Sequence, residues 1–168
     1  MNRKLSLMRR NFQMNKVHIR PATMDDAQII ANFNTLAAKE IEDRQLDPAT
    51  ALAGLRECLL DSAKGFYKVA ELGGEIVGQT MITFEWSDWR NGVFWWIQSV
   101  YIKPEARRRG IFTALYENIH AEARRRSDVC GLRLYVEKNN KRAQKIYADL
   151  GIGLSDFLMH EIDFYFHE

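Results

Sequence analysis

The spacing of hydrophobic and polar positions predicts two helices in the first third of the chain. Between residues 24 and 41, apolar side chains recur every three or four positions, which is the period of an amphipathic helix. Thr23 and Asp26 have the spacing of a capping box at its start. Asp47 and Pro48 suit the cap and first turn of a second helix.

The middle of the chain has the pattern of strands. Residues 66–72 and 75–86 are rich in β-branched and aromatic side chains, and they flank Gly73 and Gly74. Two glycines suit the positive φ angles of a tight turn, so this segment predicts a hairpin. Residues 93–102 are apolar on both faces, which is typical of a central strand covered on both sides.

The other elements complete an α+β order without repeats or long linkers. Further helices are predicted at 111–126 and 141–150, and further strands at 17–20, 131–136 and 157–166. Gly151 stands where a helix C-cap belongs. We therefore expect a single α+β domain over residues 16–168, preceded by a flexible basic tail at 1–15.

Composition excludes several classes of protein. The 168 residues include 24 Lys+Arg and 22 Asp+Glu, and a net charge of +2 argues against a dedicated nucleic-acid-binding protein. Two cysteines and four histidines are too few and too scattered for a disulfide framework or a metal site. No apolar run reaches membrane-spanning length, and the N-terminus lacks the apolar core of a signal peptide. We expect a cytoplasmic protein that binds neither metal nor membrane.

A basic turn between a strand and a helix is the first candidate for chemistry. Arg107, Arg108, Arg109 and Gly110 lie between the predicted central strand and the helix that begins at residue 111. The first amides of a helix attract anions, and arginines add charge and paired hydrogen bonds. The turn therefore suits a phosphate, although a solvated basic turn that only starts a helix explains the same residues.

This turn resembles the signature of the GCN5-related N-acetyltransferase (GNAT) family, which is Gln/Arg-x-x-Gly-x-Gly/Ala. Arg107 and Gly110 match its first two positions. Phe112 departs from the third, where a small residue normally permits close approach of the coenzyme. The departure concerns the fit near the pyrophosphate, where backbone amides can still donate whatever the side chain.

A second motif follows about 30 residues later. Asn140, Ala143, Tyr147 and Gly151 match the family pattern Asn-x-x-Ala-x-x-x-Tyr-x-x-x-Gly at every position. The two motifs stand in the family's order, and the order of elements from Val17 onward matches as well. The resemblance implies a mixed, mostly antiparallel sheet with helices on both faces, splayed between the fourth and fifth strands.

The resemblance implies acetyl-CoA as the acetyl donor. In the family, backbone groups of the central strand hold the thioester and pantetheine, the basic turn holds the pyrophosphate, and the tyrosine hydroxyl serves the departing sulfur. The residues that would contact the coenzyme here are Ser99, Val100, Tyr101, Ile102, Arg107, Arg108, Arg109, Gly110, Ile111, Phe112, Thr113, Asn140, Ala143 and Tyr147. Tyr147 is the expected catalytic acid.

The general base is less clear from the sequence. Many relatives carry a glutamate where this chain has Gln98, and a glutamine cannot accept the proton. The remaining candidates are Glu85, and Glu40 or Glu42 at the end of the first helix, acting directly or through water, but each such residue is more often a solvated surface carboxylate than a base. Acidic residues at 40–43 and 85–88, beside two tryptophans, would suit a cationic amine.

The function that we expect is transfer of an acetyl group to a primary amine of a small cationic molecule. The neutral amine would attack the thioester directly, without a covalent intermediate on the protein. The alternatives are a non-catalytic acyl-CoA-binding module of the same fold, and an acetyltransferase acting on a protein lysine or N-terminal amine. The expected partners are then a small-molecule amine and a second copy of the chain in a homodimer, but no nucleic acid and no membrane.

Overall fold

The computed structural model describes residues 16–165, except the side chain of Glu42. The chain divides into two compact units, one ending at Tyr135 and the other beginning at Val136. The basic tail predicted at 1–15 lies outside the described residues. The single domain over residues 16–168 stays a prediction.

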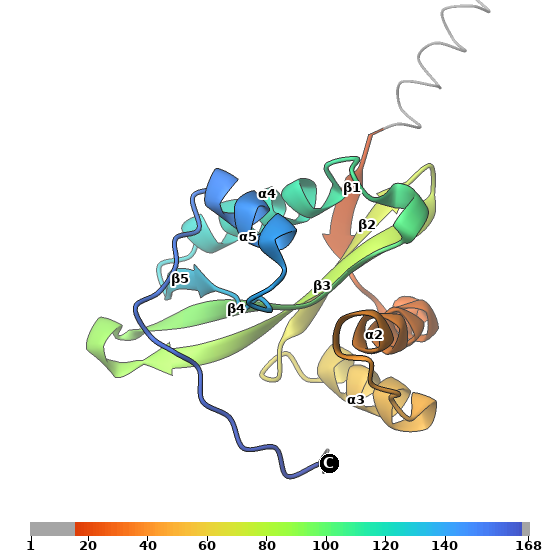
Figure 1. Ribbon diagram of the computed structural model, residues 1–168, viewed down its shortest axis with the longest axis horizontal. Coiled ribbons are helices and arrows are strands. Elements are labelled where there is room, and N and C mark those ends of the chain that lie inside the picture. Colours follow the sequence, from red (N-terminus) through yellow and green to blue (C-terminus); the bar gives the residue numbers. More distant parts are fainter. Residues whose placement is uncertain (1–15, 166–168) are drawn as a thin grey trace, which may run out of the picture. The chain divides into compact units, whose positions relative to one another are not determined.

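A five-stranded sheet is the frame of the first unit (Figure 1). The strands lie across the sheet in chain order, from β1 to β5, and the first three pairings are antiparallel. Only β5 is parallel to its neighbour β4. The predicted mixed, mostly antiparallel sheet is therefore confirmed. The strands are β1 (His18–Pro21), β2 (Phe66–Leu72), β3 (Glu75–Ser87), β4 (Gly92–Ile102) and β5 (Val129–Arg133).

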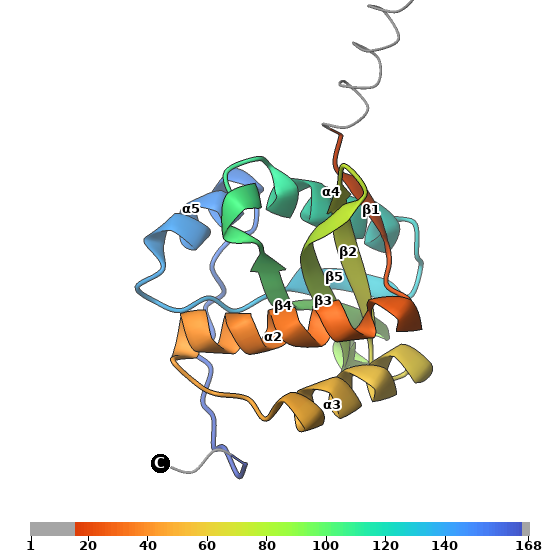
Figure 2. The same cartoon turned by 90° about the vertical axis from the view of Figure 1, so that its right-hand side faces the viewer.

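Helices cover both faces of this sheet (Figure 2). Neighbouring β2 residues point to opposite sides: Val69 packs in a cluster with Ile30, and Ala70 packs in a cluster with Ile111. The first cluster includes residues of α2 and α3, and the second includes residues of α4. Their bounds are α2 (Ala27–Glu42), α3 (Pro48–Leu60) and α4 (Ile111–Arg124), with short 3₁₀ turns η1 (Met24–Asp26), η2 (Asp88–Arg90) and η3 (Pro104–Ala106).

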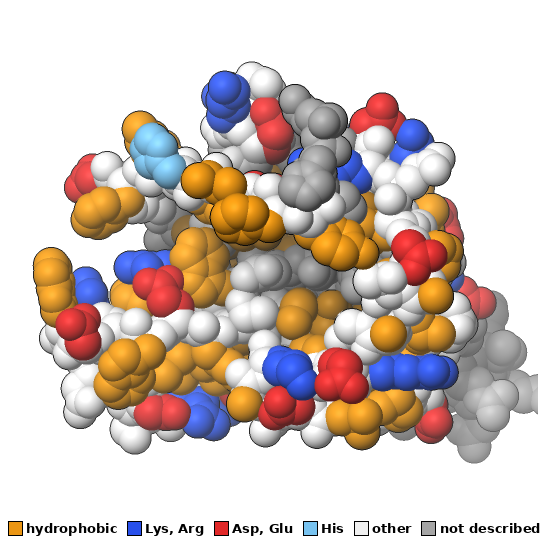
Figure 3. All heavy atoms as spheres, turned by 90° about the horizontal axis from the view of Figure 1, so that it is seen from below, with side chains coloured by type: hydrophobic (Ala, Val, Ile, Leu, Met, Phe, Trp, Pro, Cys, Tyr) orange, Lys and Arg blue, Asp and Glu red, His pale blue; other side chains and the backbone are white. Residues whose placement is uncertain are grey.

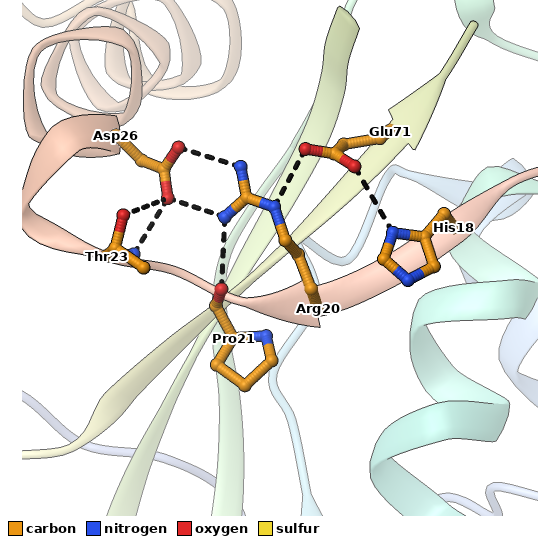
Figure 4. A network of polar contacts seen from close by, with 6 residues as sticks. All are labelled: His18, Arg20, Pro21, Thr23, Asp26 and Glu71. Atoms are coloured by element: carbon orange, nitrogen blue, oxygen red, sulfur yellow. Dashed lines mark hydrogen bonds and ion pairs between the residues drawn. The ribbon is translucent and has the colours of Figure 1, made fainter. Parts of the chain in front are cut away.

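A polar network fixes the start of α2 against the sheet (Figure 4). The Asp26 carboxylate accepts hydrogen bonds from the Thr23 backbone N–H at 2.7 Å and from both terminal nitrogens of Arg20 at 2.7 and 2.9 Å. Arg20 Nε donates to Glu71 on β2 at 2.7 Å. The predicted contact between residues 23 and 26 is thus present, and it also ties β1, β2 and the helix together.

The second unit contains α5 (Lys141–Asp149). Gly151, with φ of 80°, ends this helix as predicted, and Ile152 donates its N–H to the Tyr147 carbonyl oxygen at 2.9 Å. The predicted strand at 157–166 is wrong for residues 157–165, which form no strand. Alternating apolar residues satisfy the strand pattern, but a strand also needs a pairing partner, and the pattern does not supply one.

Surface charge agrees with the near-neutral composition. Among the described residues, basic and acidic side chains are interspersed with hydrophobic ones on the face shown in Figure 3. Within residues 16–165, no helix is long and apolar enough to cross a membrane.

Candidate active site

The pairing between strands β4 and β5 ends midway along β4. Their parallel pairing ends at Trp96 opposite Arg133. In the part of the chain that the structure describes, β4 residues 97–102 pair only with β3. The predicted splay is therefore present, and it leaves backbone groups of β4 without a strand partner on the β5 side.

A β-bulge interrupts β4 at the beginning of this open edge. Gln98 pairs with Met81 and Tyr101 with Gln79, so two β4 residues, Ser99 and Val100, lie opposite a single β3 residue. Ser99 has a φ of 48°, a left-handed conformation that residues with side chains rarely adopt.

The bulge changes which amides face the open edge. The Val93 N–H donates to the Asp128 oxygen on the β5 side at 2.8 Å, whereas the Lys103 N–H donates to the Val77 oxygen of β3 at 2.9 Å. Backbone N–H groups of a regular strand alternate between its two edges, so residues 93 and 103 would otherwise face the same edge. Counting back from Lys103, the N–H groups of Ile102 and Val100 face the open edge.

The N-terminus of α4 follows directly. Gly110 precedes the helix with a φ of 74°, and no side chain caps the helix start. A Cβ on Gly110 would meet no atom within 4 Å, so the approach to this end of α4 is open. The amides of Ile111, Phe112 and Thr113 have no acceptor within the helix, and the helix dipole favours an anion beside them.

The Arg107 side chain stabilises the turn between β4 and α4 through hydrogen bonds. Its Nε donates to the Ile102 carbonyl oxygen at 2.9 Å, and its two terminal nitrogens donate to the Glu40 carboxylate at 2.7 and 2.6 Å. The guanidinium lies 5.8 Å from the centre of the Tyr101 ring. The Glu40 hydrogen bonds raise the pKa of Arg107, so the guanidinium stays ionised. Arg108 and Arg109 are exposed.

The Phe112 side chain stacks along the helix. Its ring lies 6.4 Å from the Tyr116 ring, which in turn lies 5.7 Å from the His120 ring. These three residues share one face of α4, at intervals of four. The large side chain at the position where the family has a small one therefore contacts its own helix.

The two candidate bases already have partners. Glu85 accepts hydrogen bonds from Trp96 Nε1 and Arg133, each at 2.5 Å, and the hydrogen bond from Trp96, followed by that from Arg133, lowers the pKa of Glu85. Glu40 binds Arg107. Arg107 in turn lies over the ring of Tyr101, which pairs with Gln79 on β3. From the rise per residue of a strand, Glu85 is about 20 Å along β3 from Gln79. The structure does not bring Glu40 and Glu85 together.

The second motif lies on α5. The Asn140 side chain accepts a hydrogen bond from the Ala143 N–H at 3.1 Å, so it caps the helix. Burial raises the pKa of Tyr147, and its hydroxyl therefore keeps its proton at neutral pH. Helix capping accounts for the asparagine locally, whereas the Tyr147 hydroxyl retains a proton that it can donate.

Three polar residues next to the bulge belong to neither sequence motif. Gln79 Nε2 donates to Asn34 Oδ1 at 2.6 Å and to the Ser99 carbonyl oxygen at 3.4 Å. Asn34 Nδ2 donates to the Tyr67 hydroxyl at 3.2 Å. Burial raises the pKa of this hydroxyl, and its polar contacts with the Asn34 and Ser99 side chains lower it. The available sequence signal was a polar side chain at positions where the apolar pattern predicts core.

The comparisons with known proteins agree with this geometry. The model of the acetyltransferase (GNAT) family matches residues 30–152. A possible acetyltransferase from Clostridium difficile 630 is 44% identical, with 88% of this chain and 97% of that chain covered and a TM-score of 0.82. No curated protein matches the sequence.

Two more distant structures share the fold. A predicted acetyltransferase from Clostridium acetobutylicum, solved with acetyl-CoA, is 20% identical over 91% of this chain and 100% of that chain, with a TM-score of 0.71. A ribosomal-protein-alanine N-acetyltransferase from Brucella melitensis biovar Abortus 2308 is 21% identical over 89% and 99%, with a TM-score of 0.70. From the family match and the 44% identity, we conclude that this chain belongs to the GNAT acetyltransferase family.

Proposed function

We propose that this protein transfers an acetyl group from acetyl-CoA to a primary amine of a small cationic molecule. The amine attacks directly, and no covalent intermediate forms on the protein. The observation that carries the proposal is the continuous segment 97–113, in which an open strand edge leads into an uncapped helix N-terminus.

The residues of this segment fit the coenzyme. The N–H groups of Val100 and Ile102, which face the open edge, are donors for carbonyl oxygens of the acetyl and pantetheine parts. The amides of Ile111, Phe112 and Thr113, with the exposed Arg108 and Arg109, suit the pyrophosphate. Acetyl-CoA supplies the acetyl group as a thioester, whose carbonyl the strand amides would polarise.

Tyr147 is the proposed acid. Its hydroxyl is protonated at neutral pH because burial raises its pKa, so it can give a proton to the departing sulfur. This role rests on the match of Tyr147 to the family motif and on that pKa.

The acceptor amine must lose a proton before it attacks, because an alkylamine is protonated at neutral pH. A base role for Glu85 or Glu40 stays a prediction, and the hydrogen bonds that each carboxylate accepts weaken it. Two tryptophans near Glu85 are well exposed, Trp86 at 61% and Trp89 at 90%. The aromatic rings and the acidic residues at 85–88 suit a cationic molecule, but Glu85 lies about 20 Å along β3 from Gln79, beside the bulge.

A non-catalytic acyl-CoA-binding module is the second candidate. It is favoured by the same hydrogen bonds, since Glu40 and Glu85 are both engaged and Gln98 cannot act as a base. Such a module would bind the coenzyme through segment 97–113 without turnover.

A thiol-release assay separates the two candidates. The protein is incubated with acetyl-CoA and a panel of polyamines, aminoglycosides, amino acids and lysine peptides, and free coenzyme A is measured. We expect amine-dependent release with a small cationic amine. Coenzyme binding without release for any amine would favour the binding module, and release only with peptides would favour a protein acceptor.

A further inference from the structure

The bulge in β4 is held by side chains rather than by the ladder. The Gln98 carbonyl oxygen accepts a hydrogen bond from Thr80 Oγ1 at 3.1 Å, and the Ser99 carbonyl oxygen accepts one from Gln79 Nε2 at 3.4 Å. Both donors belong to β3 residues beside the bulge. The left-handed conformation of Ser99 is unfavourable in itself, so it persists only where surrounding contacts impose it.

These contacts continue into a network from three elements. Asn34 on α2 is hydrogen-bonded to Gln79 on β3 and to Tyr67 on β2, and the Tyr67 hydroxyl contacts the Ser99 side chain. Gln79 is fully buried, and Tyr67 is 4% exposed. Hydrogen bonds in such a water-poor environment are strong and hold their partners rigidly.

We infer that Asn34, Tyr67 and Gln79 are positioning residues that hold Ser99 in its bulged conformation and thereby aim the Val100 and Ile102 amides at the open edge. This inference rests on the proposed function, in which these amides polarise the acetyl carbonyl. Without the bulge, the alternation of the strand would turn the Tyr101 amide toward that edge instead.

Packing alone does not explain a glutamine at this position. Gln79 Oε1 is buried and has no hydrogen-bond partner among residues 16–165. A buried amide with an unpaired oxygen is less favourable than an apolar side chain of similar shape. The polar side chain is therefore best explained by what its nitrogen holds, which is Asn34 and the Ser99 carbonyl oxygen.

The experiment compares Tyr67→Phe in two backgrounds. Glycine adopts the left-handed conformation without penalty, so Ser99→Gly removes the need for the network, while Ser99→Ala keeps that need. In the wild-type background, we expect Tyr67→Phe to lower kcat about tenfold through misplaced amides, with the Kd for coenzyme A changed less than about twofold. Ser99→Ala alone, which removes the hydroxyl that contacts Tyr67 but keeps the left-handed residue, should lower kcat in the same way. In the Ser99→Gly background, its effect on kcat should stay below about twofold.

A second readout does not depend on turnover. Amide hydrogen exchange of the peptide covering residues 97–103, measured on the unliganded protein, should be faster in Tyr67→Phe than in wild type. In Ser99→Gly, adding Tyr67→Phe should leave the exchange unchanged. The matched control Tyr116→Phe removes the same atom from a tyrosine on α4 outside the network, and it should leave both readouts unchanged.

Equal kcat for Tyr67→Phe and wild type, or the same loss in the Ser99→Gly background, would overturn the inference. If wild type transfers acetyl to no amine, the proposed function fails instead, and hydrogen exchange still decides whether the network holds the bulge. Unchanged exchange in Tyr67→Phe would then reject the network as well.

Discussion

At the residue scale, one hydroxyl and one carboxylate have very different settings. Tyr147 is half-buried, and its burial raises the pKa of the hydroxyl, which keeps its proton. Glu85 is held ionised by Trp96 and by Arg133, whose guanidinium also lies 3.8 Å from the centre of the Phe94 ring. The first arrangement keeps a proton available for transfer, and the second disfavours taking one.

Replacement of Tyr147 by phenylalanine tests the acid. We expect Tyr147→Phe to lower kcat about 100-fold, since general acid catalysis typically contributes that much, while the Kd for acetyl-CoA changes less than about twofold. Because the raised pKa keeps the hydroxyl protonated, wild-type kcat should fall only above the ordinary tyrosine pKa. Thiol-release kinetics across pH measure both effects. Equal kcat in the two proteins would remove Tyr147 as the acid.

Replacement of Glu85 by glutamine tests the carboxylate. Because hydrogen bonds lower the pKa of Glu85, it is a weak base, and we expect Glu85→Gln to reduce kcat less than about threefold. The KM for a cationic amine should change less than about twofold, since Glu85 is paired with Arg133 and lies about 20 Å along β3 from Gln79, beside the bulge. Glu75→Gln, at the exposed start of β3, is the control for the charge change. A 100-fold fall in kcat would instead identify Glu85 as the base.

At the element scale, the junction between β1 and α2 depends on a single buried carboxylate. Asp26 has a pKa of about 2, lowered chiefly by its hydrogen bonds from Arg20. A carboxyl group whose pKa is lower in the folded protein adds stability above its unfolded pKa, near 4, and loses it as pH falls toward 2.

This pKa predicts an acid-sensitive part of the stability. Between about pH 5 and pH 2, wild type should lose about 2 kcal/mol of unfolding free energy through Asp26. Asp26→Asn should be less stable than wild type at pH 7, and the difference between the two should shrink toward pH 2. Urea unfolding at several pH values measures it. A difference that stays constant with pH would contradict the assignment.

Local sequence patterns predict the elements well where neighbours in the chain determine them. The hairpin formed by 66–72 and 75–87 follows from strand-forming residues around two glycines with positive φ. The ion pair between Arg107 and Glu40 joins residues 67 positions apart, and no local pattern specifies it. The predicted strand at 157–166 fails in the described residues for the same reason, because strand pairing is a tertiary property.

In the candidate site too, local sequence predicts some features, and others depend on tertiary contacts. The turn at 107–110 and the start of α4 follow from local residues, and so does the α5 motif. The network of Asn34, Tyr67 and Gln79 could not be predicted, since its members come from three elements and meet only when the sheet forms.

At the scale of the whole molecule, coenzyme binding should raise the free energy of unfolding. A ligand that binds only the folded protein at 100 times its Kd raises the free energy of unfolding by about 2.7 kcal/mol. We expect acetyl-CoA to raise the Tm accordingly, and the Kd to weaken with salt. Calorimetric titration and thermal unfolding measure these quantities.

The double variant Arg108→Ala/Arg109→Ala should weaken the Kd about tenfold and reduce its salt dependence, because both side chains are exposed beside the α4 N-terminus. Arg124→Ala/Arg125→Ala makes the same charge change at the other end of α4 and should bind like wild type. Equal weakening by the two double variants would show that net charge, rather than this turn, attracts the coenzyme.

All four tryptophans of the chain lie on β3, β4 or the turn between them. Intrinsic fluorescence is therefore a local reporter of this hairpin and not of the fold as a whole. Trp86 and Trp89 are open to solvent, while Trp95 is 3% exposed and Trp96 donates to Glu85. Iodide quenching should divide the emission into an accessible and a protected fraction.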